Sequence, residues 1–135
     1  MDSESSYTTK PSPWPVPQTV ERLTSLIAAK GMQLFAAIDQ RAAAHQAGLE
    51  LRETVLLLFG NPAAGTPVMD AVPLSALDLP LKLLIWDDEG TTRVSYVAPA
   101  ALAARYDLPP ALAAPLAGID GFTDAALSPT DPGPG

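Results

Sequence analysis

The sequence contains no cysteine and a single histidine, His45. Without cysteine the chain has no disulfide, no thiolate nucleophile and no cysteine-based metal site. One histidine excludes a multi-histidine metal site within one chain. His45 also lacks an evident partner that would orient it for catalysis, which favours a surface residue. We therefore expect neither a metal nor a cofactor.

Positive charge is scarce as well, because 8 Lys and Arg face 15 Asp and Glu, giving a net charge of −7. Nucleic acids and anionic membrane surfaces select clusters of Lys and Arg, so neither is an expected partner. No apolar run approaches the roughly 20 residues that span a membrane. Residues 1–4 are polar and lack the apolar segment of a secretory signal. These observations together predict a cytoplasmic protein.

What the chain does have is enough apolar content for one packed core. Its 135 residues are 47% hydrophobic, which suits a single domain. We expect a flexible N-terminus at 1–6, one domain at 7–127 and a disordered Pro- and Gly-rich tail at 128–135.

Hydrophobic periodicity divides the domain into alternating elements. The expected strands are 7–10, 32–39, 53–59, 81–87 and 91–97. The expected helices are 18–30, 40–47, 66–72, 99–106 and 111–127. A turn at 88–90 joins the last two strands into a hairpin. The strands at 53–59 and 81–87 are apolar on both faces, so both faces of the sheet need a cover.

The segment that follows the strand at 53–59 is the main candidate for a binding site. Gly60 and Asn61 end the strand, and Thr66 is a suitable N-cap for a helix that has Pro67 in its first turn. Gly65, directly before that start, is expected to need a positive φ or a close contact that excludes a side chain.

A Gly-bearing loop that opens a helix can direct backbone N–H groups at an anion. The ligand-binding candidates are therefore Gly60, Asn61, Gly65 and Thr66, with Lys82 as the nearest expected cation. The alternative is a tight strand-to-helix turn in which both glycines serve conformation and packing alone.

Three motifs carry a family resemblance: Phe-Gly-Asn-Pro at 59–62, Gly-Thr-Pro-Val-Met at 65–69 and Leu-Asp-Leu-Pro-Leu-Lys at 77–82. They resemble the DUF302 (TT1751-like) family, and the resemblance runs from about residue 7 to about residue 127. It implies an α+β domain with a TBP-like β-α-β(4)-α arrangement, a mainly antiparallel sheet and helices packed on one face. It implies no known reaction.

Two carboxylates supply an alternative, enzymatic hypothesis. Asp39 ends a strand and Asp78 precedes Leu79-Pro80, and a close pair of acids could perform acid–base chemistry. Each acid is also well placed to cap a helix or close a turn. The family pattern is commonly Ile-Asp-His, whereas this chain has Gln40 after Asp39. Gln40 cannot titrate or act as an imidazole ligand, which weakens an enzymatic interpretation.

The sequence thus favours a non-enzymatic module that binds a small anionic or apolar ligand, or a partner chain. A small enzyme using Asp39 and Asp78 is the alternative. The strands that are apolar on both faces also predict self-association. An open face carrying Val55, Leu57, Leu84 and Trp86, or the opposite set, would need a cover. A two-fold homodimer would supply it, and the alternative cover is the helical region at 111–127.

Overall fold

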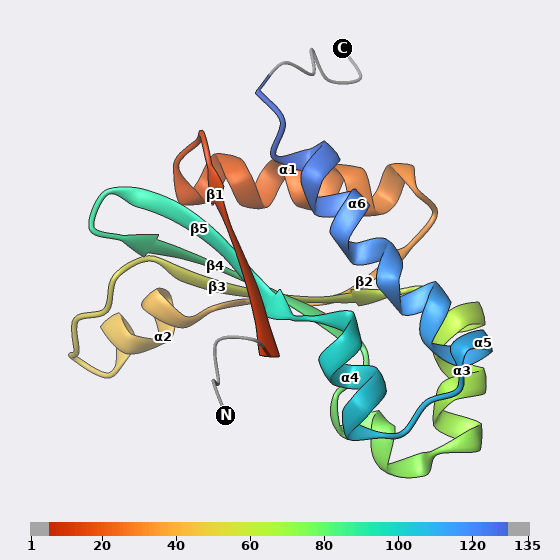
Figure 1. The fold of residues 1–135 in the computed structure, drawn as a ribbon. Helices are drawn as coiled ribbons and strands as arrows, with labels where there is room; N and C mark the ends of the chain where they lie inside the picture. Colours follow the sequence, from red (N-terminus) through yellow and green to blue (C-terminus); the bar gives the residue numbers. More distant parts are fainter. Residues whose placement is uncertain (1–5, 130–135) are drawn as a thin grey trace.

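Residues 6–129 are described by the computed structural model, and they form one five-stranded sheet with helices around it (Figure 1). The strands are β1 Tyr7–Ser12, β2 Gln33–Asp39, β3 Thr54–Gly60, β4 Leu81–Asp88 and β5 Thr91–Val97. The helices are α1 Val16–Ala29, α2 Gln40–Gln46, α3 Pro62–Ala71, α4 Pro99–Arg105, α5 Pro110–Ala113 and α6 Gly118–Ala126. Short 3₁₀ segments occupy Pro73–Leu77 (η2) and Ala114–Ala117 (η3). Of the ends expected to be flexible, residues 1–5 and 130–135 lie outside the described residues.

The strand order is β1-β5-β4-β3-β2, and every neighbouring pair is antiparallel. The predicted α+β class with a mainly antiparallel sheet is therefore confirmed. The predicted hairpin is also present, as β4 and β5 pair from Asp88 opposite Thr91 to Leu84 opposite Ser95. Glu89 and Gly90 at its tip both have positive φ, which suits the twist of a tight hairpin.

Helix α1 forms because its apolar residues recur three to four positions apart and share one face. Val16, Leu23 and Ile27 are at most 2% exposed, and they face the core. The helix begins two residues before the expected Gln18, since Pro17 fits the first turn of a helix. At this end the Arg22 guanidinium lies 4.1 Å from the centroid of the Trp14 ring.

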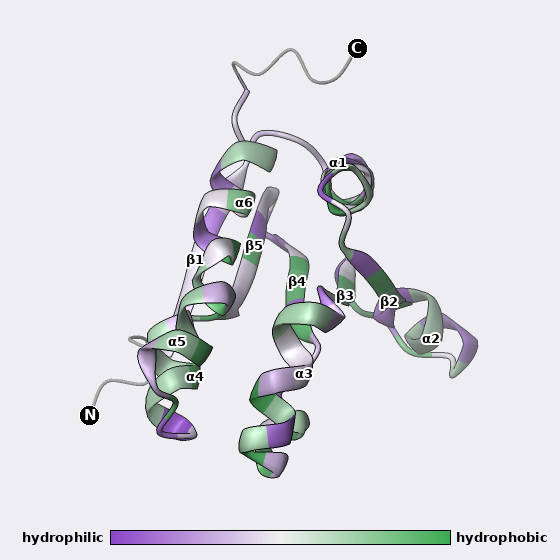
Figure 2. Cartoon of the chain, turned by 90° about the vertical axis from the view of Figure 1, so that its right-hand side faces the viewer, coloured by the Kyte–Doolittle hydropathy of each residue, from purple (hydrophilic) through white to green (hydrophobic). Residues whose placement is uncertain are grey.

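The core lies between α1, α6 and one face of the sheet. Leu57 pairs with Leu83 and Ile85 pairs with Val94, and all four side chains are fully buried on that face. Helices α1 and α6 lie on the same side of the sheet (Figures 1 and 2). The C-terminal helical region therefore covers the face that carries Leu57.

The composition of the opposite face differs from the prediction. Leu56 pairs with Leu84, and residues directly opposite each other in an antiparallel pair share a face. Leu57 and Leu84 therefore lie on opposite faces, and grouping them on one open face was wrong. The face away from α1 and α6 carries half-buried Leu56, Leu58, Leu84 and Trp86. On this side α2 and α4 flank the two ends of the sheet (Figure 1).

A polar cluster fixes α6 to the edge of the sheet. Lys10 of β1 donates to the Asp120 carbonyl at 2.9 Å and to the Thr123 hydroxyl at 2.7 Å, and it pairs with Asp124 at 2.8 Å. Burial lowers the pKa of Lys10, but the hydrogen bond with Asp124 and that with Tyr96 outweigh it, so its pKa is raised. The pKa of Tyr96 is also raised. Burial is the main cause, and the hydrogen bond that the Tyr96 hydroxyl donates to Asp120 at 2.5 Å is the second.

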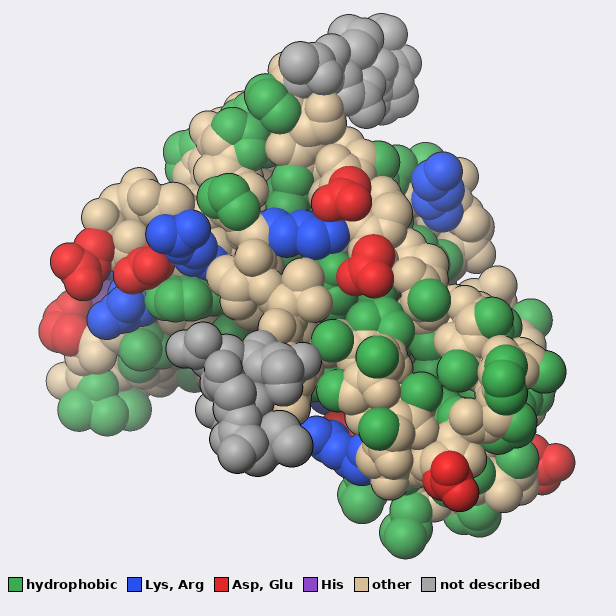
Figure 3. Space-filling model, viewed as in Figure 1, with side chains coloured by type: hydrophobic (Ala, Val, Ile, Leu, Met, Phe, Trp, Pro, Cys, Tyr) green, Lys and Arg blue, Asp and Glu red, His purple; other side chains and the backbone are tan. Residues whose placement is uncertain are grey.

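In the view of Figure 3, basic and acidic side chains gather together at the left, and a basic side chain lies apart at the upper right. Hydrophobic side chains gather at the lower right, where α3, α4 and α5 lie. Among residues 6–129, none of the helices combines the length and the apolar character needed to cross a membrane.

Candidate ligand-binding site

The loop after β3 is shorter than predicted. Asn61 is the N-cap of α3, its Oδ1 accepting from the Ala63 N–H at 2.9 Å, and Pro62 occupies the first turn. The predicted N-cap at Thr66 is therefore wrong, because Thr66 and Pro67 lie inside α3. The Asn-Pro pair supplies the cap and the first-turn proline earlier in the chain, so the helix starts there.

This earlier start changes the role of the loop's backbone. The N–H groups of Ala64 and Gly65 both donate to the Asn61 carbonyl at 2.9 Å, and that of Ala63 is bound by the Asn61 side chain. The Gly65 N–H, one of the donors expected to face an anion, is thus already engaged within the helix. Gly65 has ordinary helical geometry, and a Cβ there would lie 3.9 Å from Met69 Cε, an ordinary contact distance. The expectation of a positive φ or an excluded side chain at Gly65 is therefore wrong.

A cavity of about 490 Å³ opens beside this loop. The end of the sheet contributes Phe59, Gly60 and Leu81, and the segment that leads from α1 into β2 contributes Lys30, Met32 and Phe35. The facing walls are α3 and the chain through η3 and α6. Those walls contribute Pro62, Ala64, Gly65, Met69, Pro115, Leu116, Gly118, Ile119, Gly121, Phe122 and Ala125. Leu79 and Pro80, joined by a cis peptide bond, complete the lining.

Small residues explain why the space between the two walls stays open. Gly118, Gly121 and Ala125 recur at three- and four-residue spacing, so they share one face of α6. Ala64 and Gly65 occupy the α3 wall. A Cβ added at Gly118 or Gly121 would meet no atom within 4 Å. Larger residues lie at the base, where Phe59 and Phe122 stack with ring centroids 5.7 Å apart.

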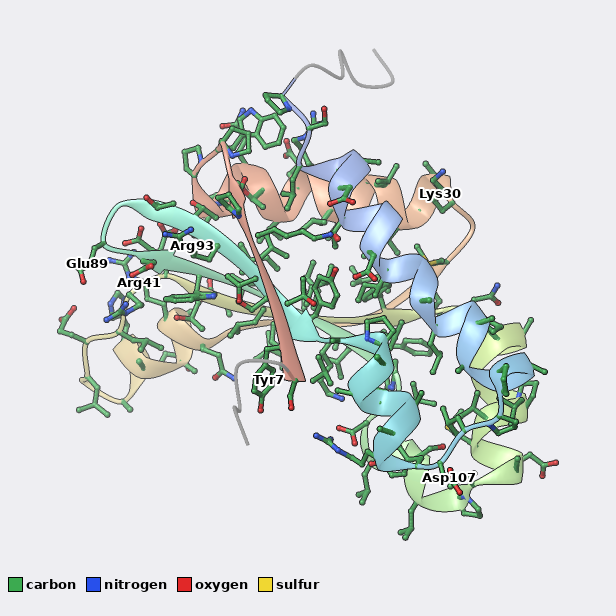
Figure 4. The ribbon with its side chains drawn as sticks, viewed as in Figure 1. Tyr7, Lys30, Arg41, Glu89, Arg93 and Asp107 are labelled. Carbon is green, nitrogen blue, oxygen red and sulfur yellow. The ribbon has the colours of Figure 1, made fainter. Side chains whose placement is uncertain are left out.

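The described lining is apolar apart from two side chains. Lys30 is its one ionisable residue and Asn61 its one side-chain amide. Lys30 is the C-cap of α1 and projects from the surface at that end of the helix (Figure 4). No Asp or Glu is among the lining residues of the described chain. The site therefore suits an apolar body with polar contacts at its rim.

The sequence-derived candidates divide between two places. Gly60, Asn61 and Gly65 line the large cavity, whereas Thr66 does not. Lys82 lines a separate cavity of about 210 Å³ that it shares with Asp78, and its Nζ donates to the Pro80 carbonyl at 3.3 Å. The cation that lines the large cavity is thus Lys30, whereas the sequence led us to expect Lys82.

The two candidate carboxylates lie apart. Asp39 caps α2, accepting from the Ala42 N–H at 2.9 Å, and it lies opposite Val55 at one end of β3. Asp78 lies three residues before Leu81, which pairs with Phe59 at the other end of β3. Four residues of strand span about 13 Å, so the structure does not bring the two acids together.

Asp78 is engaged in a local network instead. It accepts hydrogen bonds from the Tyr106 hydroxyl and, at 2.9 Å, from Arg105. The pKa of this carboxyl lies below its ordinary value. The hydrogen bond from Tyr106 lowers it most, partial burial opposes this effect, and Arg105 lowers it further. His45 lies elsewhere, exposed on α2, with Nε2 3.6 Å from Glu50. Among the described residues no group of three or more His, Asp or Glu could hold a metal ion.

Sequence reasoning missed the α6 wall and Lys30. The spacing of Gly118, Gly121 and Ala125 was visible as a stripe of small residues, but its meaning depends on what faces it. Lys30 carries no local signal beyond its place at the end of a helix. Both become part of a site only because the end of α1, α3 and α6 line one cavity at the same end of the sheet.

Comparison with known proteins gives both sequence relatives and a solved structure. "Fluoride-specific ion channel FluC 1" of Brucella suis biovar 1 is 38% identical over 106 residues, covering 78% of this chain and 42% of that protein. "Fluoride-specific ion channel FluC 1" of Brucella abortus biovar 1 and "Fluoride-specific ion channel FluC 2" of Brucella melitensis biotype 1 match with the same identity, and 39% of each is covered. This chain spans about two fifths of the length of these relatives.

The solved structure is that of an uncharacterized conserved DUF302 protein from Bacillus stearothermophilus. It superposes with a TM-score of 0.76 at 24% identity, covering 90% of this chain and 95% of that one, which shows the same fold. The family described as "Domain of unknown function DUF302" matches residues 8–126, nearly the whole described domain. The chain therefore belongs to the DUF302 family.

Proposed function

We propose that this domain is a non-enzymatic module that binds a small apolar ligand in the cavity between α3 and α6. The observation that carries the proposal is the cavity itself, about 490 Å³ and lined almost wholly by apolar groups. Ligand sites in proteins typically have volumes of about 300–1,000 Å³ and a mostly hydrophobic lining with few polar groups.

The arrangement of the walls supports the proposal further. A packed protein interior leaves few voids larger than a water molecule. Here the walls at α3 and α6 include Ala64, Gly65, Gly118, Gly121 and Ala125, and a Cβ added at Gly118 or Gly121 would meet no atom within 4 Å. The base of the cavity, formed by Phe59 and Phe122, is part of the buried core and hence preformed. Burial of an apolar ligand would supply the contacts that this surface lacks.

Calorimetric titration with a neutral alcohol series tests the proposal. At about 0.8 kcal/mol per buried methylene, octan-1-ol should bind about 15 times more tightly than hexan-1-ol. Ala125→Leu and Ala64→Leu, on opposite walls, should each weaken octan-1-ol binding. Ala104→Leu makes the same change at an exposed position of α4 outside both cavities and should leave binding unchanged. No octan-1-ol binding by the unmodified protein, or equal losses in all three variants, would contradict the proposal.

The relatives support a second candidate function. Because three proteins named as fluoride-specific ion channels contain a region 38% identical to this chain, we also propose that the domain acts as an accessory module beside such a channel. The remaining part of the Brucella suis protein, purified in detergent, should co-elute with this domain in size-exclusion chromatography. Separate elution of the two at micromolar concentration would remove this candidate.

A further inference from the structure

We propose that the ligand is an amphipathic anion, an apolar chain ending in a carboxylate-like head, with Lys30 and Asn61 binding the head at the rim of the large cavity. This inference rests on the proposed apolar-ligand function and adds the chemistry of the polar end. It follows from the unequal distribution of charge around the cavity.

The first step is the charge of the lining. The chain has 15 Asp and Glu against 8 Lys and Arg, so a cavity rim formed at random would more often carry acids. The described lining instead carries one cation, Lys30, and no acid. A ligand with a cationic head would meet like charge there, and a neutral ligand would gain nothing from it. An anionic head would gain a charge-assisted hydrogen bond.

The second step is that Lys30 has no acidic partner among residues 6–129. The ion pairs within that range occupy other basic residues: Lys10 with Asp124, Arg93 with Asp88, and Arg105 with Asp78, besides His45 with Glu50. Lys30 follows the last turn of α1, and Figure 4 shows it projecting from the surface at that point. Its ammonium can remain hydrated while the four-carbon stem lies along apolar surface.

The third step is the polarity of Asn61. Its Oδ1 accepts from the Ala63 N–H, which places the amide NH₂ as the free end of the side chain. An ammonium and an amide NH₂ are both donors. The polar side chains of the described lining therefore offer donors to an incoming head group, and a carboxylate offers only acceptors. The apolar chain would extend inward toward Phe59 and Phe122, and the head would remain at the solvent-facing rim.

Three ligands of equal chain length test this inference by calorimetric titration at pH 7: octanoate, octan-1-ol and octylammonium. Octanoate should bind about three- to fivefold more tightly than octan-1-ol, as a partly exposed ion pair is worth up to about 1 kcal/mol. Octylammonium should bind more weakly than octan-1-ol. The preference for octanoate should shrink in high salt, because an exposed ion pair is screened.

Variants then locate the effect. Lys30→Gln should reduce octanoate binding to the level of octan-1-ol and leave octan-1-ol unchanged. Asn61→Asp retains a capping oxygen for α3 while it replaces the amide donor with a carboxylate, and it should also weaken octanoate alone. Lys82→Gln is the matched control, since it removes the same charge at the smaller cavity and should change neither ligand.

The outcomes separate this inference from the function on which it rests. Equal binding of octanoate and octan-1-ol by the unmodified protein would overturn the anionic head and leave the apolar site standing. Equal losses of octanoate in Lys30→Gln and Lys82→Gln would overturn it too, because the effect would then reflect net charge alone. If none of the three ligands binds, both the inference and the proposed function are wrong.

Discussion

Two glycines of this domain should respond in opposite ways to the same substitution. Gly65 lies inside α3 with helical geometry, and a new Cβ would meet Met69 Cε at the ordinary contact distance of 3.9 Å. Gly31 follows the C-cap of α1 with a φ of +73°, and a Cβ there would meet no atom within 4 Å. Space is therefore available at both positions, and backbone conformation decides the result.

The magnitudes follow from that difference. Alanine in a helix is favoured over glycine by about 0.5–1 kcal/mol, so Gly65→Ala should stabilise the fold by that amount. A left-handed conformation costs a residue with a Cβ roughly 1–2 kcal/mol, so Gly31→Ala should destabilise by about 1 kcal/mol. For a domain of this size, 1 kcal/mol shifts the melting temperature by about 4 °C.

Urea unfolding and thermal melting of the ligand-free proteins, followed by circular dichroism, measure both changes. We expect a higher midpoint for Gly65→Ala and a lower one for Gly31→Ala, with unchanged denaturant slopes. A lower midpoint for Gly65→Ala would refute the reasoning. It would mean that this residue needs the conformational freedom of glycine, and that α3 starts later than Pro62.

Three further predictions concern charge and association. Asp78→Asn should lower stability at neutral pH and make stability depend less on pH in acid. The pKa of Asp78 is lowered in the folded state, so its stabilising contribution is fully present above the ordinary pKa of 3.8 and is lost as the pH falls through the folded-state pKa. An unchanged pH profile of the urea midpoints would contradict this. Lys10→Met should lower the free energy of unfolding by about 1–3 kcal/mol because its bonds to α6 are lost, whereas an unchanged midpoint would show that α6 is held without them. We also propose a two-fold homodimer through the open sheet face, which Leu84→Asp should convert to monomer or aggregate; a monomer mass for the unmodified protein in light scattering at micromolar concentration would refute it.

Local signals were sufficient to predict most of the elements. The Val- and Leu-rich run before Gly60 predicts a buried strand, and the apolar spacing of α1 predicts its core face. The start of α3 was misplaced because two Pro-containing signals compete, Asn61-Pro62 and Thr66-Pro67. Both fit a helix start in isolation, and α3 begins at the earlier one, with Pro67 inside the helix.

Register and the site lay beyond such local reasoning. Whether Leu57 shares a face with Leu83 or Leu84 depends on pairing between strands, and a slip of one residue exchanges the two faces. The cavity depends on α3 and α6 lining the same space at the end of the sheet. Gly65 and Gly121 are remote in sequence, and neither carries a signal that names the other as its neighbour.

The position of β1 has a consequence for how the domain is made. β1 is an edge strand whose one partner in the described sheet is β5, and the Thr9 and Ser95 hydroxyls hydrogen bond across 86 residues of sequence. β1 therefore cannot pair until Ser95, 86 residues after Thr9, has been synthesised. During that interval it is an unpaired edge. Because such long-range pairing is slow, docking of β1 should be a late step of folding.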